Sequence, residues 1–345
     1  MEYIYDININ EAVIQILDSN SSDPVLNEYS LELNEDVYKF LYRHIEKCLK
    51  DDELKYAKFN SERNMVKEVV QDYLNGTDSD LVELSKELAR QLFIIIKTNE
   101  NIPSADLIVS SITTDQGPMI AILKMDYVNN FTHEVQFIEE KIGVGIIRQN
   151  AGLPGSGQKV QKAAFIKPIR NDEMYNLMVL NKQKSLKEDE YGANYFLDTF
   201  LGASTVTNER DMTKTFVKAT ENWTRNNVTD NAAKAEEIRT AIKNKLDDND
   251  SINIEEFADE MFKEAPQAKE DYTNYIKSQG LKNEIAVDKT WVDKNLKRIR
   301  LRIDKEIDIY INRQSYEDKD KFEIVRNGDG SINMIIKNVI NYIEK

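Results

Sequence analysis

The chain has 345 residues, of which 41% are hydrophobic and 31% charged, and its net charge is −15. This composition is ordinary for a soluble globular protein, and the length favours two or three subdomains. The acidic balance argues against a general nucleic-acid coat, because neutralising phosphates requires clustered lysine and arginine, although it leaves room for a localised basic patch.

Targeting and redox signals are few. The single cysteine, Cys48, rules out an internal disulfide and fits a reducing compartment. The start of the chain is acidic and lacks the basic segment of a secretory signal. The longest apolar run, Leu92–Ile96, is too short to span a bilayer. We therefore expect a cytoplasmic protein with no membrane partner.

The first hundred residues predict one strand followed by helices. Residues 3–18 alternate at first and then take a helical spacing, which predicts an edge strand followed by a short helix or an extended arm. Asn34 and Asp80 are suited to cap helices that follow them, and a further helix is expected over 61–74.

An antiparallel sheet is predicted next. The turn residues Asp115–Pro118 join two apolar runs and predict a hairpin. The expected strands are 105–112, 119–127, 135–138, 143–147, 160–169 and 175–183, the third and fourth being weaker candidates. A glycine-rich loop, AGLPGSGQ at 151–158, interrupts them.

An aromatic elbow at 188–223 separates this half from a helical middle. The apolar residues of its first helical segment are Tyr195, Phe196, Phe200 and Leu201. Gly202 then ends that segment, since a left-handed glycine closes the last turn of many helices. Ser204, Thr205 and Asn208 are turn or cap candidates before a second helix that begins at Glu209. The ordinary interpretation of the aromatic residues is core packing.

Helices continue to about residue 285, and strands return after it. Asn253 and Pro266 mark two later helix starts. The C-terminal strands are expected at 297–304 (KRIRLRID), 307–311, 321–325 and 331–337. The predicted fold class is α+β in three parts. These are an N-terminal domain with helices and an antiparallel sheet (1–187), a helical middle (188–285) and a small β-rich C-terminal unit (286–345).

Several segments resemble the bacterial nucleoid-associated protein family (NdpA-like). FLDTFLGAS at 196–204, followed by a helix ending in ENW, is similar to the centre of that family. ADLIVSSI at 105–112, IAILKMDY at 120–127 and IRLRIDKE at 299–306 fall in the family's order. The resemblance spans most of the chain. It implies a cytoplasmic protein associated with the nucleoid and with DNA, and it implies no catalytic residues.

Basic residues gather in two islands. Residues 145–187 carry eight lysines and arginines against two acidic residues, and residues 289–305 carry seven against two. Such islands in an acidic body would focus an anionic partner onto one surface. The DNA-binding candidates are Lys159, Lys162, Lys167, Arg170, Lys297, Arg298, Arg300 and Arg302.

The alternation of arginines at 298–302 is the sharper signal. A strand would place three guanidinium groups on one face about 7 Å apart, within the range of phosphate spacing along one DNA strand. The competing interpretations are a solvated sheet face or arginines paired with the abundant aspartate and glutamate of the helical middle.

Other motifs favour catalytic or ligand sites less strongly. Asp126, Glu139 and Lys141 have the order of a metal-nuclease set, in which carboxylates hold a metal and lysine polarises phosphate. The loop at 151–158 lacks the Gly-Lys-Ser/Thr ending of a phosphate loop and precedes a strand. His44 and Cys48 have half the spacing of a zinc site, but core packing explains them better.

The sequence thus predicts a non-enzymatic, nucleoid-associated protein without a cofactor. Its expected partner is double-stranded DNA, contacted largely through the backbone, and a homodimer would pair the basic patches. One alternative is an acidic protein-interaction module in a nucleic-acid-processing or phage-defence assembly. The second alternative is the metal-dependent nuclease.

Overall fold

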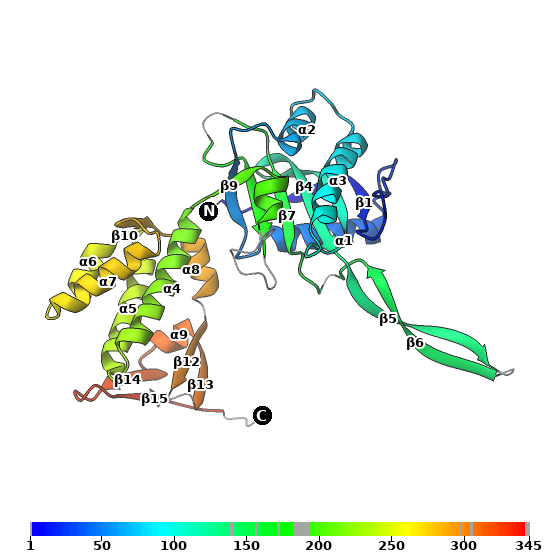
Figure 1. Cartoon of the computed structure of the whole chain (residues 1–345). Coiled ribbons are helices and arrows are strands. Elements are labelled where there is room, and N and C mark those ends of the chain that lie inside the picture. Colours follow the sequence, from blue (N-terminus) through cyan, green and yellow to red (C-terminus); the bar gives the residue numbers. More distant parts are fainter. Residues whose placement is uncertain are drawn as a thin grey trace. The chain divides into compact units, whose positions relative to one another are not determined.

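The computed structural model describes residues 2–138, 141–155, 157–170, 173–182, 194–296, 298–303 and 306–341. The chain forms two compact units with the boundary between Val206 and Thr207. We refer to Glu2–Val206 as the N-terminal unit and to Thr207–Lys345 as the C-terminal unit. Figure 1 labels many of the helices and strands of each.

The N-terminal unit is built on a seven-stranded antiparallel sheet in the order β1-β3-β4-β7-β8-β2-β9. The strands are β1 (Ile7–Leu17), β2 (Lys55–Phe59), β3 (Ala105–Thr114), β4 (Gly117–Asp126), β7 (Lys162–Ile166), β8 (Leu177–Asn181) and β9 (Ala203–Val206). The predicted β3–β4 hairpin is confirmed, and Gly117 takes a positive φ of 99° in its turn.

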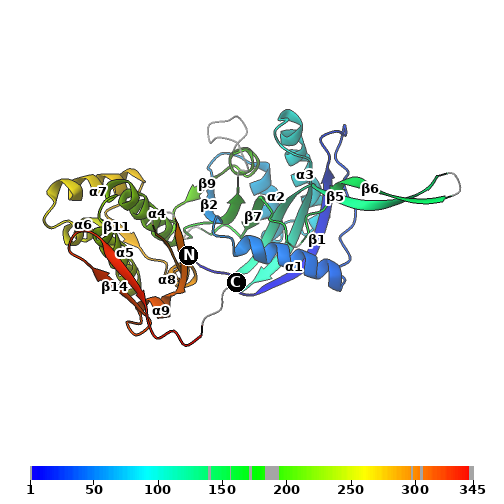
Figure 2. The ribbon, with the colours of Figure 1, turned by 90° about the horizontal axis from the view of Figure 1, so that it is seen from below.

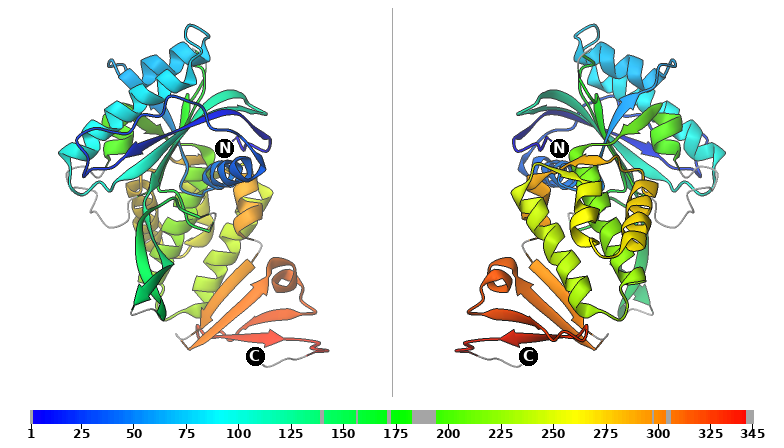
Figure 3. Two further views of the ribbon diagram at one scale, coloured as in Figure 1. Left: turned by 90° about the vertical axis from the view of Figure 1, so that its right-hand side faces the viewer. Right: turned by 90° about the vertical axis from the view of Figure 1, so that its left-hand side faces the viewer.

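Helices cover both faces of this sheet. They are α1 (Glu35–Leu49), α2 (Met65–Leu74) and α3 (Leu81–Thr98). Figure 3 shows α2 and α3 on one face and α1 on the other. The predicted caps are confirmed, since Asn34 accepts a hydrogen bond from the Val37 N–H and Asp80 accepts from Val82 and Glu83. Apolar residues of α2 and α3 pack with those of the sheet into one core.

The aromatic elbow completes that core. Its short π-helix, η1 (Tyr195–Phe200), buries Phe196 and Phe200, whose ring centroids lie 5.4 Å apart. Gly202 follows with φ +58°, the left-handed conformation expected of it. Asn64, the cap of α2, donates a hydrogen bond from Nδ2 to the Phe200 carbonyl at 3.2 Å. The elbow is therefore tied directly to the first turn of α2.

Two further strands leave the sheet as a separate two-stranded ribbon. They are β5 (Val128–Ile138) and β6 (Lys141–Gly152), inserted between the neighbouring sheet strands β4 and β7. Figures 1 and 2 both show the ribbon projecting from the body of the N-terminal unit. The weak strand predictions at 135–138 and 143–147 are confirmed, although the strands are much longer than the sequence indicated.

The C-terminal unit has a helical core of its own. Its helices are α4 (Glu209–Asn227), α5 (Ala232–Asp248), α6 (Ile254–Met261), α7 (Pro266–Ser278) and α8 (Lys289–Asn295). The short strands β10 (Ser251–Asn253) and β11 (Glu284–Ala286) pair between them. Trp223 stands at the centre of the core, with ring centroids 5.1 Å from Phe262 and 5.2 Å from Tyr272.

The end of the chain consists of two hairpins and a short helix. The elements are β12 (Arg298–Ile303), β13 (Ile307–Asn312), α9 (Arg313–Glu317), β14 (Phe322–Arg326) and β15 (Ile332–Ile336). They are the orange and red elements in Figure 3. Phe322 is buried and stacks on Tyr316 of α9, which holds the second hairpin to the helix.

The predicted α+β class with an antiparallel sheet is confirmed, while two local predictions need correction. Of the alternatives for 3–18, the short helix is wrong, because β1 runs unbroken to Leu17. A bulge between Ile9 and Glu11 shifts the strand alternation, which gives the apolar residues a misleading helical spacing. Ser204 and Thr205 lie in β9 and not in a turn, since they pair with β2.

Candidate nucleic-acid interface

The eight predicted DNA-binding residues divide between the two units. Lys159, Lys162, Lys167 and Arg170 belong to the N-terminal unit, and the other four to the C-terminal unit. Lys297 lies outside the described residues, and the structure describes the backbone of Arg298 but not its side chain. The remaining six differ sharply in exposure, and that difference decides which of them are available to a phosphate.

Lys162 is buried in the sheet. Only 6% of it is exposed, and its Nζ donates a hydrogen bond to Oδ1 of Asn181 on the neighbouring strand β8. Its cross-strand partner on β4 is Lys124, itself buried and paired with Asp126. Burial and the charge of Lys124 lower the pKa of Lys162 to about 8, and Asp126 offsets this only in part. Lys162 is therefore unsuited to contact a phosphate.

This burial predicts an unusual dependence of stability on pH. Below about pH 8 the folded and unfolded states both carry the Lys162 charge, and its burial costs the folded state in full. Between about pH 8 and 10.5 only the unfolded state keeps the proton, so stability rises with pH. We expect Lys162→Met to raise the free energy of unfolding near pH 7 by roughly 1–3 kcal/mol and to reduce this rise.

Urea unfolding at pH 7 and pH 9.5 would measure both effects. Lys58→Met, which changes an exposed side chain, serves as the control and should alter neither quantity. An unchanged pH dependence in the Lys162→Met variant would contradict the assignment of a buried, charged lysine.

Lys167 is also buried and contacts neighbouring side chains, whereas Arg170 is exposed. The Lys167 ammonium lies 3.9 Å from the ring centroid of Tyr175 and 3.3 Å from a carboxylate oxygen of Glu173. Lys167 is 9% exposed. Arg170 follows in an exposed segment after β7. Of the four N-terminal candidates, Lys159 and Arg170 therefore remain accessible.

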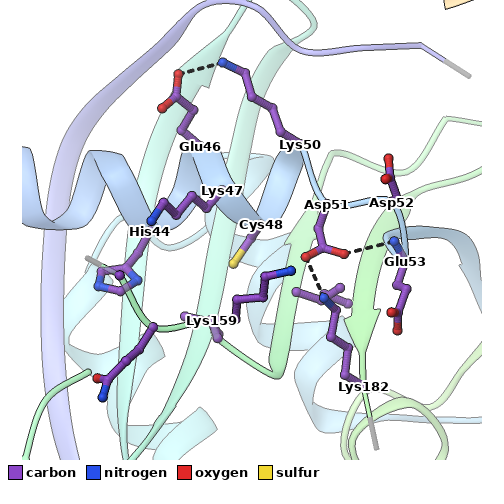
Figure 4. Close-up of a pocket in the computed structure, with 14 residues that line it drawn as sticks. His44, Glu46, Lys47, Cys48, Lys50, Asp51, Asp52, Glu53, Lys159 and Lys182 are labelled. Carbon is purple, nitrogen blue, oxygen red and sulfur yellow. Dashed lines mark hydrogen bonds and ion pairs between the residues drawn. The ribbon is translucent and has the colours of Figure 1, made fainter. Parts of the chain in front are cut away.

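Lys159 lines a cavity of about 430 Å³ in the N-terminal unit. The end of α1, the loop that follows it, the loop before β7 and β8 form its walls (Figure 4). Lys182 Nζ lies 2.6 Å from Oδ2 of Asp51, and both side chains are largely buried. Figure 4 shows Lys159 directed toward the same carboxylate.

The cavity is balanced in charge and therefore weak as an anion site. Its basic and acidic lining residues are Lys47, Lys50, Lys159 and Lys182 against Glu46, Asp51, Asp52 and Glu53. Burial by itself raises the pKa of Asp51, but hydrogen bonds from Lys182 and the Glu53 backbone and the charges of Lys182 and Lys159 lower it overall. Asp51 is thus an ionised partner that already occupies the lysines a phosphate would need.

A different arrangement occurs on the β12–β13 hairpin. The register pairs Arg300 with Tyr310 and Arg302 with Asp308, which places these four side chains on one face. The opposite face carries isoleucine and leucine, of which Ile299 is buried. We call Arg300, Arg302 and Tyr310 the arginine–tyrosine face. The predicted strand and its alternation are confirmed.

The arginine–tyrosine face combines solvent-exposed positive charge with an exposed aromatic ring. The Arg300 guanidinium donates from Nε and Nη2 to the Asp308 carboxylate at 3.3 Å and lies 5.2 Å from the ring centroid of Tyr310. Its side chain is still 57% exposed, and Tyr310 is 69% exposed. The hydrogen bond and charge of Asp308 raise the pKa of Arg300, which keeps it cationic. Arg300 is therefore exposed and also paired, but its carboxylate partner lies on the same hairpin and not in the helical middle.

Tyr310 of this face and Asp308 beside it were not identified by the charge pattern. The run Ile307 to Ile311 alternates apolar and polar residues, which would have placed Asp308 and Tyr310 together on the polar side of a strand. The sequence does not show that this polar side lies next to the arginines. Only the register between β12 and β13 shows it.

The other motifs do not assemble into sites. Asp126 ends β4, whereas Lys141 begins β6 at the far end of the ribbon, roughly 35 Å away at 3.3 Å per residue along β5. The third member of that set, Glu139, lies outside the described residues. Among the described residues, no group of three or more histidine, cysteine, aspartate and glutamate side chains is arranged to hold a metal ion.

His44 and Cys48 both lie on the buried face of α1. The His44 Nε2 lies 3.0 Å from the Pro154 carbonyl, and its ring meets Phe40 edge-on. Burial and the nearby Asp51 raise the pKa of the Cys48 thiol to about 12. These contacts are those of packed core residues.

A comparison with family models relates this architecture to known proteins. The model described as nucleoid-associated protein YejK matches residues 13–344, which includes the sheet, the ribbon and both C-terminal hairpins. The chain therefore belongs to this family of nucleoid-associated proteins. A search of curated proteins found no significant match. Within the described part of the chain, no helix is both long and apolar enough to cross a bilayer.

Proposed function

We propose that this nucleoid-associated protein is a non-enzymatic DNA-binding protein of the cytoplasm, located at the nucleoid. It contacts the backbone of double-stranded DNA with the arginine–tyrosine face of the β12–β13 hairpin. The observation that supports this most directly is the exposed guanidinium of Arg300 beside Tyr310 and Arg302 on a surface strand. Guanidinium groups bind phosphate oxygens bidentately, and neighbouring groups on one strand face match the spacing of successive phosphates.

The acidic remainder of the chain restricts where DNA can bind. With a net charge of −15, most of the protein repels a polyanion. Backbone contacts of this kind give affinity without reading the base sequence, so binding should depend strongly on salt and weakly on sequence. Arg170, which is exposed, is a further candidate on the N-terminal unit, whereas Lys159 is directed toward the Asp51 carboxylate.

The salt dependence of DNA affinity tests the proposal. Arg300→Ala/Arg302→Ala should reduce the magnitude of the slope of log K against log salt by about 1.8, since each lost phosphate contact removes about 0.9. Including Arg298→Ala should bring the reduction to about 2.7. Fluorescence anisotropy with a short duplex over a salt series would measure these slopes.

A matched control removes the same charge elsewhere in the C-terminal unit. Lys218 and Lys282 are exposed lysines outside the hairpin, and Lys218→Ala/Lys282→Ala should leave the slope nearly unchanged. Tyr310→Ala should weaken binding without changing the slope, because it removes no charge. A slope that is equal in the wild type and the arginine variant would exclude this face.

The second candidate function is a protein-interaction module of a nucleic-acid-processing or phage-defence assembly. The pairing of Arg300 with Asp308 favours it, since a guanidinium already bound to a carboxylate is suited to a protein partner. A mobility-shift experiment separates the two functions. If the wild type fails to shift duplex DNA even at low salt, DNA binding is excluded and the protein partner is favoured.

A further inference from the structure

The β5–β6 ribbon has one apolar face that nothing in the described chain covers. The register pairs Phe131 with Arg148, His133 with Ile146, Val135 with Val144 and Phe137 with Ile142, so all eight side chains share a face. Six of them are large and apolar, and each is more than half exposed: Phe131 73%, Val135 52%, Phe137 78%, Ile142 69%, Val144 68% and Ile146 79%. We call these six residues the ribbon face.

The opposite side of the ribbon is different in character. There Thr132, Glu134 and Gln136 face Ile147, Gly145 and Gly143 respectively, so polar side chains and glycines predominate. The ribbon is thus amphipathic along its length. An isolated two-stranded hairpin is marginally stable in water, and a contiguous exposed apolar patch usually marks an interaction site. The ribbon face therefore has the properties of a surface that is covered in the working protein.

Charge excludes a polyanion and an anionic membrane as the covering surface. From Val128 to Gly152 the charged residues are Lys141 and Arg148 against Glu134, Glu139 and Glu140, a net charge of −1. Nucleic acid and anionic lipid both select clustered lysine and arginine, which the ribbon lacks. The surface that covers the ribbon face is therefore expected to be an apolar protein surface.

The ribbon face is itself such a surface and has the size that a stable dimer needs. Two phenylalanines and four aliphatic residues, each mostly exposed, offer on the order of 700 Å² per copy. A standard stable interface buries about 800 Å² per partner. A two-fold axis that lies between two ribbons, opposite the middle of each face, would bring each face against its own copy, as closed dimers require.

We propose that the ribbon face packs against the ribbon face of a second copy, so that two ribbons stack into a four-stranded sandwich arm. The two layers would lie about 10 Å apart, the usual spacing of sheets packed face to face. Val135 and Val144 lie near the middle of the face and hence near the axis. The polar sides of both ribbons face outward. This interface does not require DNA binding, so its failure and that of the proposed function can be told apart.

Sedimentation of the full chain tests the interface. We expect a dimer for the wild type at micromolar concentration and a monomer for Val135→Lys/Val144→Glu. These two substitutions remove apolar area but place opposite charges directly across the strands, which supports the hairpin itself. The control Thr132→Lys/Ile147→Glu makes the same kind of pair on the polar side and should remain dimeric. A monomeric wild type, or a variant that stays dimeric, would overturn the proposal.

Cysteine crosslinking provides an independent measurement. The native Cys48 is 3% exposed and its pKa is raised to about 12, so it reacts poorly with maleimides. Val144→Cys should give a covalent dimer with a short bis-maleimide, whereas Gln136→Cys on the polar side should not. Equal crosslinking at the two positions would also contradict the proposed packing.

Discussion

Replacing Trp223 by alanine is expected to lower the free energy of unfolding of the C-terminal unit by about 3–5 kcal/mol. The indole is 4% exposed, and it packs edge-on against both Phe262 and Tyr272. These rings belong to α4, the end of α6 and α7, so the indole contacts three helices at once. The substitution removes that contact and leaves a cavity that α4 cannot fill without moving.

Urea denaturation followed by far-ultraviolet circular dichroism would measure this loss, since the tryptophan signal itself changes in the variant. Val217→Ala on the partly exposed side of α4 is a suitable control, with an expected loss of less than about 1.5 kcal/mol. A small loss in the Trp223→Ala variant would mean that the aromatic cluster is not the centre of this core.

Gly202→Ala is expected to destabilise the N-terminal unit by about 2–4 kcal/mol. The residue has φ +58°, and an added Cβ would lie 2.6 Å from Nδ2 of Asn64. Asn64 cannot move away freely, because its side chain caps α2 through the Lys67 N–H and also donates to the Phe200 carbonyl. The expected loss combines backbone strain with weakening of both hydrogen bonds.

A double-mutant cycle would separate these causes. Asn64→Ala removes the obstructing amide, so Gly202→Ala should cost less in that background, where the backbone strain and the remaining Cβ of residue 64, 3.1 Å away, still act. Gly155→Ala is the matched control, since its Cβ would meet nothing within 4 Å. Equal costs for Gly202→Ala with and without Asn64 would show that the close approach of Asn64 contributes nothing.

Local chemistry explains which parts of the fold were predictable from the sequence. Asn34, Asp80, Asn208 and Asn253 were all identified as caps and all accept hydrogen bonds from the first turns of their helices. A cap depends on residues two or three positions away, which the sequence displays. The strand β2 was not predicted, because it is five residues long and its partners β8 and β9 lie more than a hundred residues later.

The candidate site was predictable only where position along a strand determines exposure. Arg300 and Arg302 alternate with apolar residues on a two-stranded hairpin, so their exposure followed from the pattern. Lys162 begins a five-residue strand in the middle of the seven-stranded sheet, where all five residues are buried. A count of basic residues could not distinguish Lys162 from Arg300 and Arg302, because it contains no information about which strand is covered on both faces.

The way the ribbon leaves the sheet determines how force would act on the protein. A single residue, Tyr127, separates β4 from β5, and its hydroxyl donates to Asp106 of β3 at 3.0 Å. At this root the Lys124 ammonium donates to the Pro103 carbonyl at 3.0 Å. The ribbon thus continues directly from the interior strand β4, without an intervening flexible linker. A pulling force on the tip of the ribbon, for example from a molecule bound there, would act first on β4 in the interior of the sheet. It would reach the edge strands β1 and β9 only afterwards.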